Sequence, residues 1–555
     1  MWDDADVNDA APTDQIRAGY TFEAPAATLG VLVDGEPAVD VPIRIPLSMF
    51  NRHGLVAGAT GTGKTKTLQV MAEALSTAGV PVFAADIKGD LSGMASPGES
   101  NEKILARTQK QGQPWQPTAF PAEFYALGGQ GIGVPVRAAV SSFGPILLSK
   151  VLGLNQVQES SLGLVFHYAD KNGLLLLDLK DLVGLLKWLT SDEGKPELKG
   201  IGGVSTATAG VILRSLVTLS DQGGDVFFGE PEFEPSELLR VAPDGRGVVS
   251  LLELPQLATQ PALFSTFLMW LLADLFTSLP EVGDLDKPKL VFFFDEAHLL
   301  FNDASKAFLQ AITQTVRLIR SKGIGVFFVT QTPKDVPDDV LAQLGSRVQH
   351  QLRAHTPNDA KALKATVDTY PHSHYDLEQV LQQLGIGEAV VTVMSEKGAP
   401  TPVAWTRIWA PASSMSPTPE AQLRASVEAS PLFARYGQAV DRESAYEILT
   451  RRLEAGSAQA AAERLEAERA EAEAAAQKEQ ERTQQEWEKQ QRENERELAR
   501  LERERKQAEA ERRRYERENP SLIEQVTKSP VFKDVMRTAG REIVRSIFGT
   551  GRRGR

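Results

Sequence analysis

The stretch Gly58-Ala59-Thr60-Gly61-Thr62-Gly63-Lys64-Thr65 decides the fold, because it satisfies the phosphate-loop (P-loop) pattern G-x-x-x-x-G-K-[ST] at every fixed position. Apolar residues 54–57 precede it and predict a buried strand, and residues 66–75 follow it and predict an amphipathic helix. Glycines allow backbone N–H groups to curl around phosphate oxygens, and the helix N-terminus adds its positive dipole end. The sequence therefore predicts a site for a nucleoside triphosphate.

Two side chains of this stretch have expected roles in binding ATP and Mg²⁺. Lys64 is expected to reach the β- and γ-phosphates, and the hydroxyl of Thr65 is expected to ligate Mg²⁺. The predicted nucleotide-binding residues at this place in the chain are Gly58, Ala59, Thr60, Gly61, Thr62, Gly63, Lys64, Thr65 and Lys66.

A second motif adds the chemistry of hydrolysis. The apolar run Leu290-Val291-Phe292-Phe293-Phe294 predicts a buried strand, and it ends in Asp295 and Glu296. Asp295 is expected to hold the Mg²⁺ shell, and Glu296 is placed to polarise the water that attacks the γ-phosphate. P-loop proteins that only switch conformation often lack the second acid. The pair therefore favours steady hydrolysis, with Glu296 and Lys64 as catalytic residues.

Residues near a later strand complete the predicted site. The strand predicted over 325–330 ends at Gln331, within reach of the γ-phosphate, where an amide can report phosphate state by hydrogen bonding. Arg317 and Arg320 precede that strand and cannot easily reach their own nucleotide. Either guanidinium could serve as an arginine finger for a neighbouring subunit, and Arg320 is the stronger candidate.

Composition limits the class of protein. A chain of 555 residues can hold more than one domain, and without cysteine it has no disulfide and no thiolate metal site. No signal pattern and no run of about 18 apolar residues is found, so we expect a cytoplasmic protein. A net charge of −13 argues against a protein that coats nucleic acid over its whole surface. It leaves room for a basic channel formed on assembly.

The sequence predicts an α/β fold with a mostly parallel sheet, a helical insertion and a long charged C-terminal helix. The expected parts are a disordered acidic N-terminus over 1–24, a β-hairpin over 25–50, a P-loop ATPase domain over 51–410 with the insertion at about 140–240, a linker with short helices over 411–456, a long helix over 457–518 and an amphipathic basic segment over 519–555.

The long helix has two interpretations. A coiled coil needs an apolar seam, and the best heptad register runs through Trp487, Leu498 and Leu501 but also through glutamine, glutamate and arginine residues. Intrahelical pairs such as Glu488–Arg492 instead favour a solvated, self-supporting helix. After this helix, 521–555 combines an apolar stripe with eight basic and three acidic residues. This segment could dock on the protein's own surface or contact a partner, a membrane surface or nucleic acid.

The motifs together resemble those of a known family. The strings NRHGLVAGATGTGKTKTLQ, ADIKGDLSG, LVFFFDEAH and RSKGIGVFFVTQTP are similar to the HerA/FtsK group of RecA-like ATPases, and within it to the bacterial HerA-like YjgR family. The resemblance implies a homo-oligomeric ring, a hexamer, that pumps double-stranded DNA or, in some relatives, protein. It also implies the roles given above for Lys64, Thr65, Asp295, Glu296, Gln331 and Arg320. Arg52 matches a basic position of HerA-type proteins and is a candidate second contact to a neighbour's nucleotide.

One departure from that family bears on partners. HerA helicases carry an N-terminal β-barrel that docks a nuclease, whereas fewer than 60 residues precede the P-loop here. A nuclease partner is therefore not expected. The leading hypothesis is a ring-forming motor acting on double-stranded DNA. The alternatives are an ATP-gated scaffold that binds a partner protein or membrane surface through its C-terminal helix, and a motor that moves polypeptide.

Overall fold

The computed structural model describes residues 11–199, 202–254, 261–283, 285–301 and 306–518. It divides the chain into two compact units, residues 1–455 and 456–555. The first unit is built on one twelve-stranded sheet with the order β2-β1-β12-β11-β10-β3-β9-β8-β4-β7-β5-β6. The strands are β1 (Ala26–Asp34), β2 (Glu36–Pro46), β3 (Gly54–Ala57), β4 (Val82–Asp86), β5 (Ala122–Leu127), β6 (Val134–Val136), β7 (Val249–Glu253), β8 (Leu290–Phe294), β9 (Ile324–Thr330), β10 (Ser346–Gln349), β11 (Glu388–Thr392) and β12 (Ala404–Ile408).

Eight neighbouring strands, from β10 to β6 in that order, pair in parallel, and the other four pair antiparallel. The central strands β3, β4, β8 and β9 are buried at every position, as expected of parallel strands covered on both faces. Successive side chains of β8 point to opposite faces of the sheet. The ring of Phe294 packs on Phe264 of α10 (Pro261–Ser278), and the ring of Phe293 packs on Phe327 of β9.

The strand order is that of a RecA-like P-loop ATPase. The P-loop leads from β3 into α2 (Lys64–Thr77), the acids follow β8, and β9 lies between β3 and β8. The predicted fold class is confirmed.

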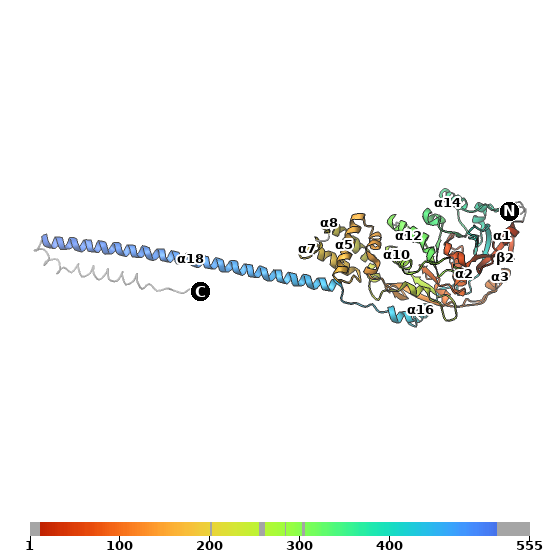
Figure 1. Cartoon of the computed structure of the whole chain (residues 1–555), viewed down its shortest axis with the longest axis horizontal. Coiled ribbons are helices and arrows are strands. Elements are labelled where there is room, and N and C mark those ends of the chain that lie inside the picture. The colour runs from red at the N-terminus through yellow and green to blue at the C-terminus, as the bar shows by residue number, and fades with distance from the viewer. Residues whose placement is uncertain (1–10, 200–201, 255–260, 284, 302–305, 519–555) are drawn as a thin grey trace. The chain divides into compact units, whose positions relative to one another are not determined.

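The remaining helices of the first unit lie between strands or after the sheet. Those before β7 are α1 (Pro12–Gly19), α3 (Glu102–Lys110), α4 (Val140–Val151), α5 (Gln156–Lys171), α6 (Leu179–Thr190), α7 (Lys195–Lys199), α8 (Thr206–Leu219) and α9 (Asp225–Phe227). Those after β7 are α11 (His298–Phe301), α12 (Lys306–Ile319), α13 (Asp338–Leu341), α14 (Pro357–Val367), α15 (Leu377–Gln383), α16 (Glu420–Glu428) and α17 (Pro431–Tyr436). Helices α4 to α9 lie between β6 and β7, and Figure 1 shows α5, α7 and α8 gathered away from α1 and α14.

Four parts of the chain differ from those expected. Residues 1–24 were expected to be disordered, but α1 forms within them, because Ile16 and Tyr20 are buried and the Tyr20 hydroxyl donates to the Val391 carbonyl at 2.9 Å. Residues 1–10 lie outside the described residues. The hairpin of β1 and β2 pairs through β1 with β12 and so extends the ATPase sheet.

Residues 411–418, expected to be part of a linker, are bonded to α2. The Glu73 carboxylate accepts hydrogen bonds from the backbone amides of Ala412 (2.8 Å) and Ser413 (2.9 Å), and Gln69 donates to Ser413 Oγ at 2.6 Å. Proline and serine content alone predicts a linker, but these contacts satisfy the segment's backbone groups and hold it in place.

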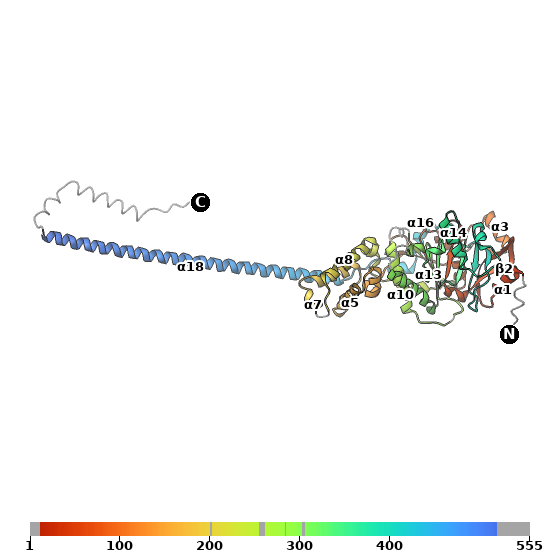
Figure 2. The same ribbon diagram turned by 90° about the horizontal axis from the view of Figure 1, so that it is seen from above.

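The last helix, α18 (Ala445–Glu518), begins earlier than the expected residue 457 because Ala445 and Leu449 pack into the first unit. Figures 1 and 2 show α18 as one continuous helix. From 457 to 518 every side chain is exposed, and i, i+4 pairs such as Arg500–Glu504 line the helix. The basic segment 519–555 lies outside the described residues. No helix in the part of the chain that the structure describes is both long and apolar enough to cross a membrane.

Candidate nucleotide site

The P-loop lies at the carboxyl edge of the parallel strands and is fastened to both neighbours of β3. The Gly58 amide donates to the Thr330 carbonyl at the end of β9 (3.2 Å), and the Ala59 amide donates to the Gln351 carbonyl just beyond β10 (2.8 Å). Both bonds fix where the loop leaves the sheet. The loop can therefore present its amides at one place above the carboxyl edge.

Glycine is required where the loop turns. Gly61 and Gly63 have φ of 81° and 115°, a region that side chains with a Cβ rarely adopt. At Gly58 an added Cβ would lie 2.5 Å from Cβ of His350, so the backbone there passes directly over that side chain. Helix α2 begins at Lys64, and its first amides have no intrahelical acceptor, which leaves them directed at an incoming anion.

Lys64 is folded back over its own loop. Its ammonium donates to the carbonyls of Gly58 (2.8 Å) and Ala59 (3.2 Å), and the residue is 7% exposed. Burial lowers the pKa of Lys64, while the charges of Glu296 and Asp295 oppose that change. An ammonium has three donors, so one remains for a phosphate oxygen. Thr65, in the first turn of α2, is placed beside it along the helix.

Asp295 and Glu296 follow β8 at the same edge of the sheet. Oδ1 of Asp295 accepts from the Glu296 amide at 2.8 Å, whereas Oδ2 is buried and has no hydrogen-bond partner among the described residues. Burial raises the pKa of Asp295 to about 7, although that amide hydrogen bond opposes the rise. Glu296 has φ of 47°, which is uncommon for a residue with a side chain and is often found at functional sites.

Lys88 is a residue of this site that the sequence prediction missed. It follows β4, the neighbour of β8, and its ammonium lies 2.5 Å from Oε1 of Glu296. Burial opposes ionisation of Glu296, but the hydrogen bond and charge of Lys88 outweigh it, so the pKa of Glu296 lies below its usual range. His298 Nδ1 lies 3.3 Å from the other oxygen of Glu296. The polar cluster at 86–90 is visible in the sequence, but only the strand order shows that it meets Glu296.

Gln331 belongs to the same edge. It is exposed and directly follows β9, the strand between those that carry the P-loop and the acids. The carbonyl of the preceding Thr330 binds the first P-loop amide, and the Ala297 amide donates to the Val329 carbonyl at 2.8 Å. The structure therefore brings Lys64, Asp295, Glu296 and Gln331 to one edge of the sheet.

Arg320 and Arg52 lie at the opposite edge. Arg320 comes before β9 and Arg52 before β3, so both stand at the amino ends of strands whose carboxyl ends meet the P-loop. The seven residues of β9 separate the two edges by roughly 20 Å at a rise of about 3.3 Å per residue. The structure does not bring these arginines together with the P-loop of their own chain.

His53, which directly precedes β3, is hydrogen-bonded to β9 at this amino edge. It is buried, its Nδ1 accepts from the Val326 amide at 3.1 Å, and Nε2 has no hydrogen-bond partner among the described residues. Burial lowers the pKa of His53 to about 4, and the charges of Arg320 and Arg52 also oppose protonation. A neutral imidazole therefore lies beside two arginines.

The side chain of Lys66 contacts the segment 411–418, and the predicted contact of Lys66 with the nucleotide stays a prediction. Its ammonium donates to the Met415 carbonyl (2.8 Å) and to Gln69 (3.2 Å), and burial lowers its pKa. Its backbone amide lies in the first turn of α2, next to the P-loop.

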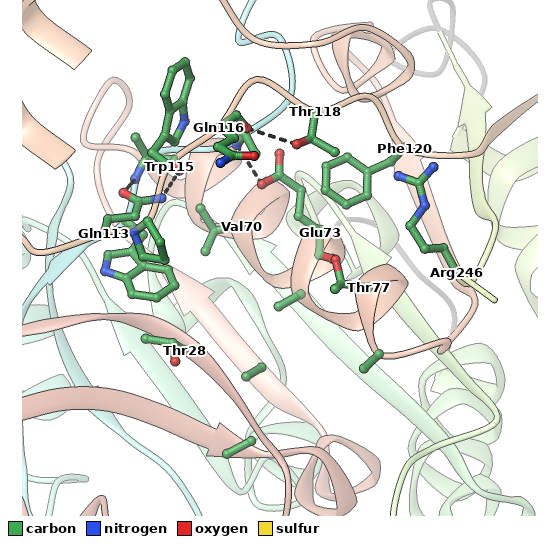
Figure 3. A pocket seen from close by; sticks show the side chains of 18 of the residues that line it. Thr28, Val70, Glu73, Thr77, Gln113, Trp115, Gln116, Thr118, Phe120 and Arg246 are labelled. Carbon is green, nitrogen blue, oxygen red and sulfur yellow. Dashed lines mark hydrogen bonds between the residues drawn. The ribbon is translucent and has the colours of Figure 1, made fainter. Parts of the chain in front are cut away.

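A pocket of about 690 Å³ lies on the flank of α2 formed by Val70, Glu73 and Thr77 (Figure 3). Trp115, Phe120 and residues of β1 complete its walls. No predicted site residue lines it, so it is separate from the P-loop.

The residues at the carboxyl edge fit Mg²⁺ bound with a nucleotide. Within the described residues, no group of three or more histidine, aspartate or glutamate side chains could hold a metal ion by itself. Mg²⁺ in phosphate sites takes only one or two protein ligands and completes its shell with phosphates and water. The unpartnered buried oxygen of Asp295 and the hydroxyl of Thr65 are such a donor set.

Comparison with known proteins agrees with this geometry. A family model described as "Helicase HerA-like C-terminal" matches residues 32–555. The chain belongs to this family. The resemblance to HerA-type P-loop ATPases that the motifs predicted is confirmed.

Two curated relatives are named DNA double-strand break repair helicase HerA. The protein from Saccharolobus solfataricus is 21% identical over 355 residues, and that from Sulfurisphaera tokodaii is 24% identical over 357 residues. Each match covers 63% of this chain and 64% of the relative, so the chain spans less than two thirds of the relatives' length.

Comparison with solved structures also found two chains that match most of their own length. The unbound bacterial conjugative coupling protein TrwB is 15% identical and covers 74% of this chain and 95% of its own, with a TM-score of 0.49. VirB4 of Thermoanaerobacter pseudethanolicus is 12% identical and covers 70% and 98%, with a TM-score of 0.44.

Proposed function

We propose that this HerA-like chain is an ATP-hydrolysing motor that assembles into a ring and translocates or remodels double-stranded DNA. The observation that carries the proposal is the separation of its functional residues between two edges of one sheet. Phosphate-binding and water-activating groups lie at the carboxyl edge, while the two candidate trans arginines lie at the amino edge. A complete site then needs two copies of the chain.

Each residue at the carboxyl edge has one task in hydrolysis. The P-loop amides and Lys64 would bind the phosphates of ATP. Thr65 and Asp295 would hold Mg²⁺, which would supply positive charge to the phosphates. Glu296 orients the attacking water and Gln331 contacts the γ-phosphate. Lys88 holds the Glu296 carboxylate in place and keeps it ionised.

The ring follows from Arg320. A guanidinium supplied across a subunit interface stabilises the charge of the transition state, and one at the amino edge is about a strand length from its own nucleotide. Arg52 is the second candidate at that interface. We expect a hexamer, in keeping with the family resemblance.

The choice of DNA rests on the family and on the names of the two relatives. The net charge of −13 requires that DNA contacts be concentrated in a basic channel within the ring. Binding should then weaken steeply with salt and show little sequence preference, because phosphate contacts dominate.

The test combines subunit mixing with DNA stimulation. Arg320→Ala and Lys64→Ala subunits should each be inactive alone, whereas mixed rings should recover activity at interfaces that pair an intact P-loop with an intact Arg320. Double-stranded DNA should stimulate wild-type ATPase activity at low salt. No recovery in proven mixed rings would count against the trans arginine, and a fully active monomer would refute the ring.

A second candidate is an ATP-gated scaffold, which the exposed apolar side chains of α18 favour. Leu465, Trp487, Leu498 and Tyr515 are each at least half exposed on that helix, and such residues suit a protein partner. ATPase activity that is indifferent to DNA, together with protein that does not bind DNA at low salt, would make this function the better one. Deleting 521–555 tests whether DNA binding comes from that segment.

A further inference from the structure

His350 is a buried ionisable side chain beside the P-loop that the mechanism above does not use. It follows β10, and its residue is fully buried. Its backbone amide donates to the Ala57 carbonyl at 2.7 Å, which places it directly under the start of the P-loop. Cβ of His350 is the atom that a Cβ on Gly58 would meet.

Both ring nitrogens of His350 have partners on different segments. Nδ1 lies 2.8 Å from the Glu388 carbonyl, and Nε2 lies 2.8 Å from Oγ1 of Thr67 in the first turns of α2. A carbonyl can only accept, so Nδ1 carries the proton and Nε2 accepts from the Thr67 hydroxyl. The imidazole is neutral, in keeping with the burial that lowers its pKa to about 4.

The Glu388 side of this bridge also supports the loop. The Gly387 amide donates to the Thr62 carbonyl at 2.9 Å, and Gly63 packs so closely on Gly387 that a Cβ there would lie 3.2 Å from it. The P-loop therefore packs between the His350 ring and the turn before β11. The Thr67 bond attaches the first turns of α2 to the same support.

We propose that His350 is a positioning residue for nucleotide binding: by accepting from Thr67 and donating to Glu388, it sets the P-loop and the N-terminus of α2 in the geometry that binds the phosphates. This inference rests on the proposed function and adds to it a residue 283 positions away from Thr67 in the chain. A threonine hydroxyl in a helix can donate to the backbone carbonyl one turn earlier, and that bond bends the helix. Because the Thr67 hydroxyl donates to His350 instead, the first turns of α2 keep the geometry in which their amides meet phosphate.

A double-variant cycle tests the bond. Thr67→Val removes the hydroxyl and keeps the shape, whereas Thr67→Ser keeps the hydroxyl and is the matched control. His350→Asn keeps a donor for Glu388 but is too short to reach Thr67. We expect Thr67→Val and His350→Asn each to raise the Kd for Mg·ATP by about 3- to 10-fold, the range given by one hydrogen bond. Thr67→Ser should bind nearly as the wild type does, and the double variant should bind no more weakly than the weaker single variant.

The readout separates positioning from simple stabilisation. Kd is measured well below the unfolding temperature of every variant, so a residue that only stabilises the fold would change the unfolding temperature and leave Kd unchanged. The KM for ATP should rise with Kd, while kcat changes less, because Glu296 and Asp295 are untouched.

Two results would overturn the inference: Thr67→Val binding ATP as tightly as the wild type, or effects of the two single variants that add independently in Kd. If His350→Asn does not fold, the comparison of Thr67→Val with Thr67→Ser still decides. The Lys64→Ala variant distinguishes failure of the proposed function from failure of this inference. If Lys64→Ala bound ATP as tightly as the wild type, the P-loop would not be the nucleotide site, and both the proposed function and the role of His350 would be overturned.

Discussion

The two edges of the parallel sheet differ in what they contain and in how complete they are. The carboxyl edge carries the P-loop glycines at positive φ, two lysines and two carboxylates. Lys64 contacts the P-loop directly, and Lys88 contacts Glu296 directly. The amino edge carries Arg52 and Arg320 around a buried neutral histidine. The first edge carries the residues proposed to bind and hydrolyse a nucleotide, and the second has cations far from the P-loop of its own chain.

Under the proposed function, this difference means that one chain contributes complementary halves to two nucleotide sites. Strands β3 and β9 run from the arginine edge to the P-loop edge, and both are paired and fully buried along their length. Four variants can break or sharpen the comparison.

The largest effect is expected at the amino edge. Arg320→Ala should lower ATP turnover by about 1000-fold or more, the range of arginine fingers, while nucleotide binding persists. Arg317→Ala, a change of an exposed arginine on α12, is the matched control and should have little effect. Steady-state turnover and nucleotide Kd are the measurements. Equal losses in both variants would remove the special role of Arg320.

Next in size is the catalytic carboxylate at the carboxyl edge. Glu296→Gln should lower turnover by about 100- to 1000-fold, because an amide cannot serve as a base for the attacking water. Binding of Mg·ATP should survive, since Lys64 and Asp295 remain. A variant that turns over as fast as the wild type at saturating ATP would contradict this assignment.

A smaller effect is expected for Lys88→Met at the same edge. Lys88 lowers the pKa of Glu296, so without it that pKa should rise and the acidic limb of the pH–rate profile should move to higher pH. Lys88→Arg keeps the charge and should keep the wild-type profile. An unchanged acidic limb in Lys88→Met would show that the ion pair does not set the ionisation of Glu296.

The smallest effect concerns stability and the buried histidine of the amino edge. His53 has a folded pKa of about 4 against about 6.5 in the unfolded chain, so its contribution to stability is complete above pH 6.5 and falls as the pH drops towards 4. At pH 5 the loss should be about 2 kcal/mol relative to pH 7.5.

The comparison with His53→Asn isolates that contribution. Asparagine tolerates the positive φ of 61° at this position, and it does not titrate. The difference in unfolding free energy between wild type and variant, measured by urea unfolding, should therefore shrink by that amount between pH 7.5 and 5. Buried carboxylates such as Asp86, whose raised pKa acts in the opposite sense, are present in both proteins and cancel. A constant difference across this range would show that His53 is not neutral in the fold.

The local chemistry of this protein could be predicted from the sequence. The P-loop and the Asp295-Glu296 pair are runs of adjacent residues whose backbone geometry is set by glycine and by flanking apolar strands, so they identify themselves without distant contacts. The fold class followed from the alternation of such strands with helices.

Only the tertiary structure decided which distant residues meet. Lys88 reaches Glu296 because β4 pairs with β8, and His350 reaches Thr67 because β10 pairs with β3. The ordering of α1 and of residues 411–418 likewise depends on partners far along the chain. Strand order is fixed by the packing of buried faces over the whole sheet, and no short stretch of sequence contains that information. The sequence by itself therefore determined the motifs of the proposed nucleotide site, because adjacent residues carry them, and the fold determined which distant residues support those motifs.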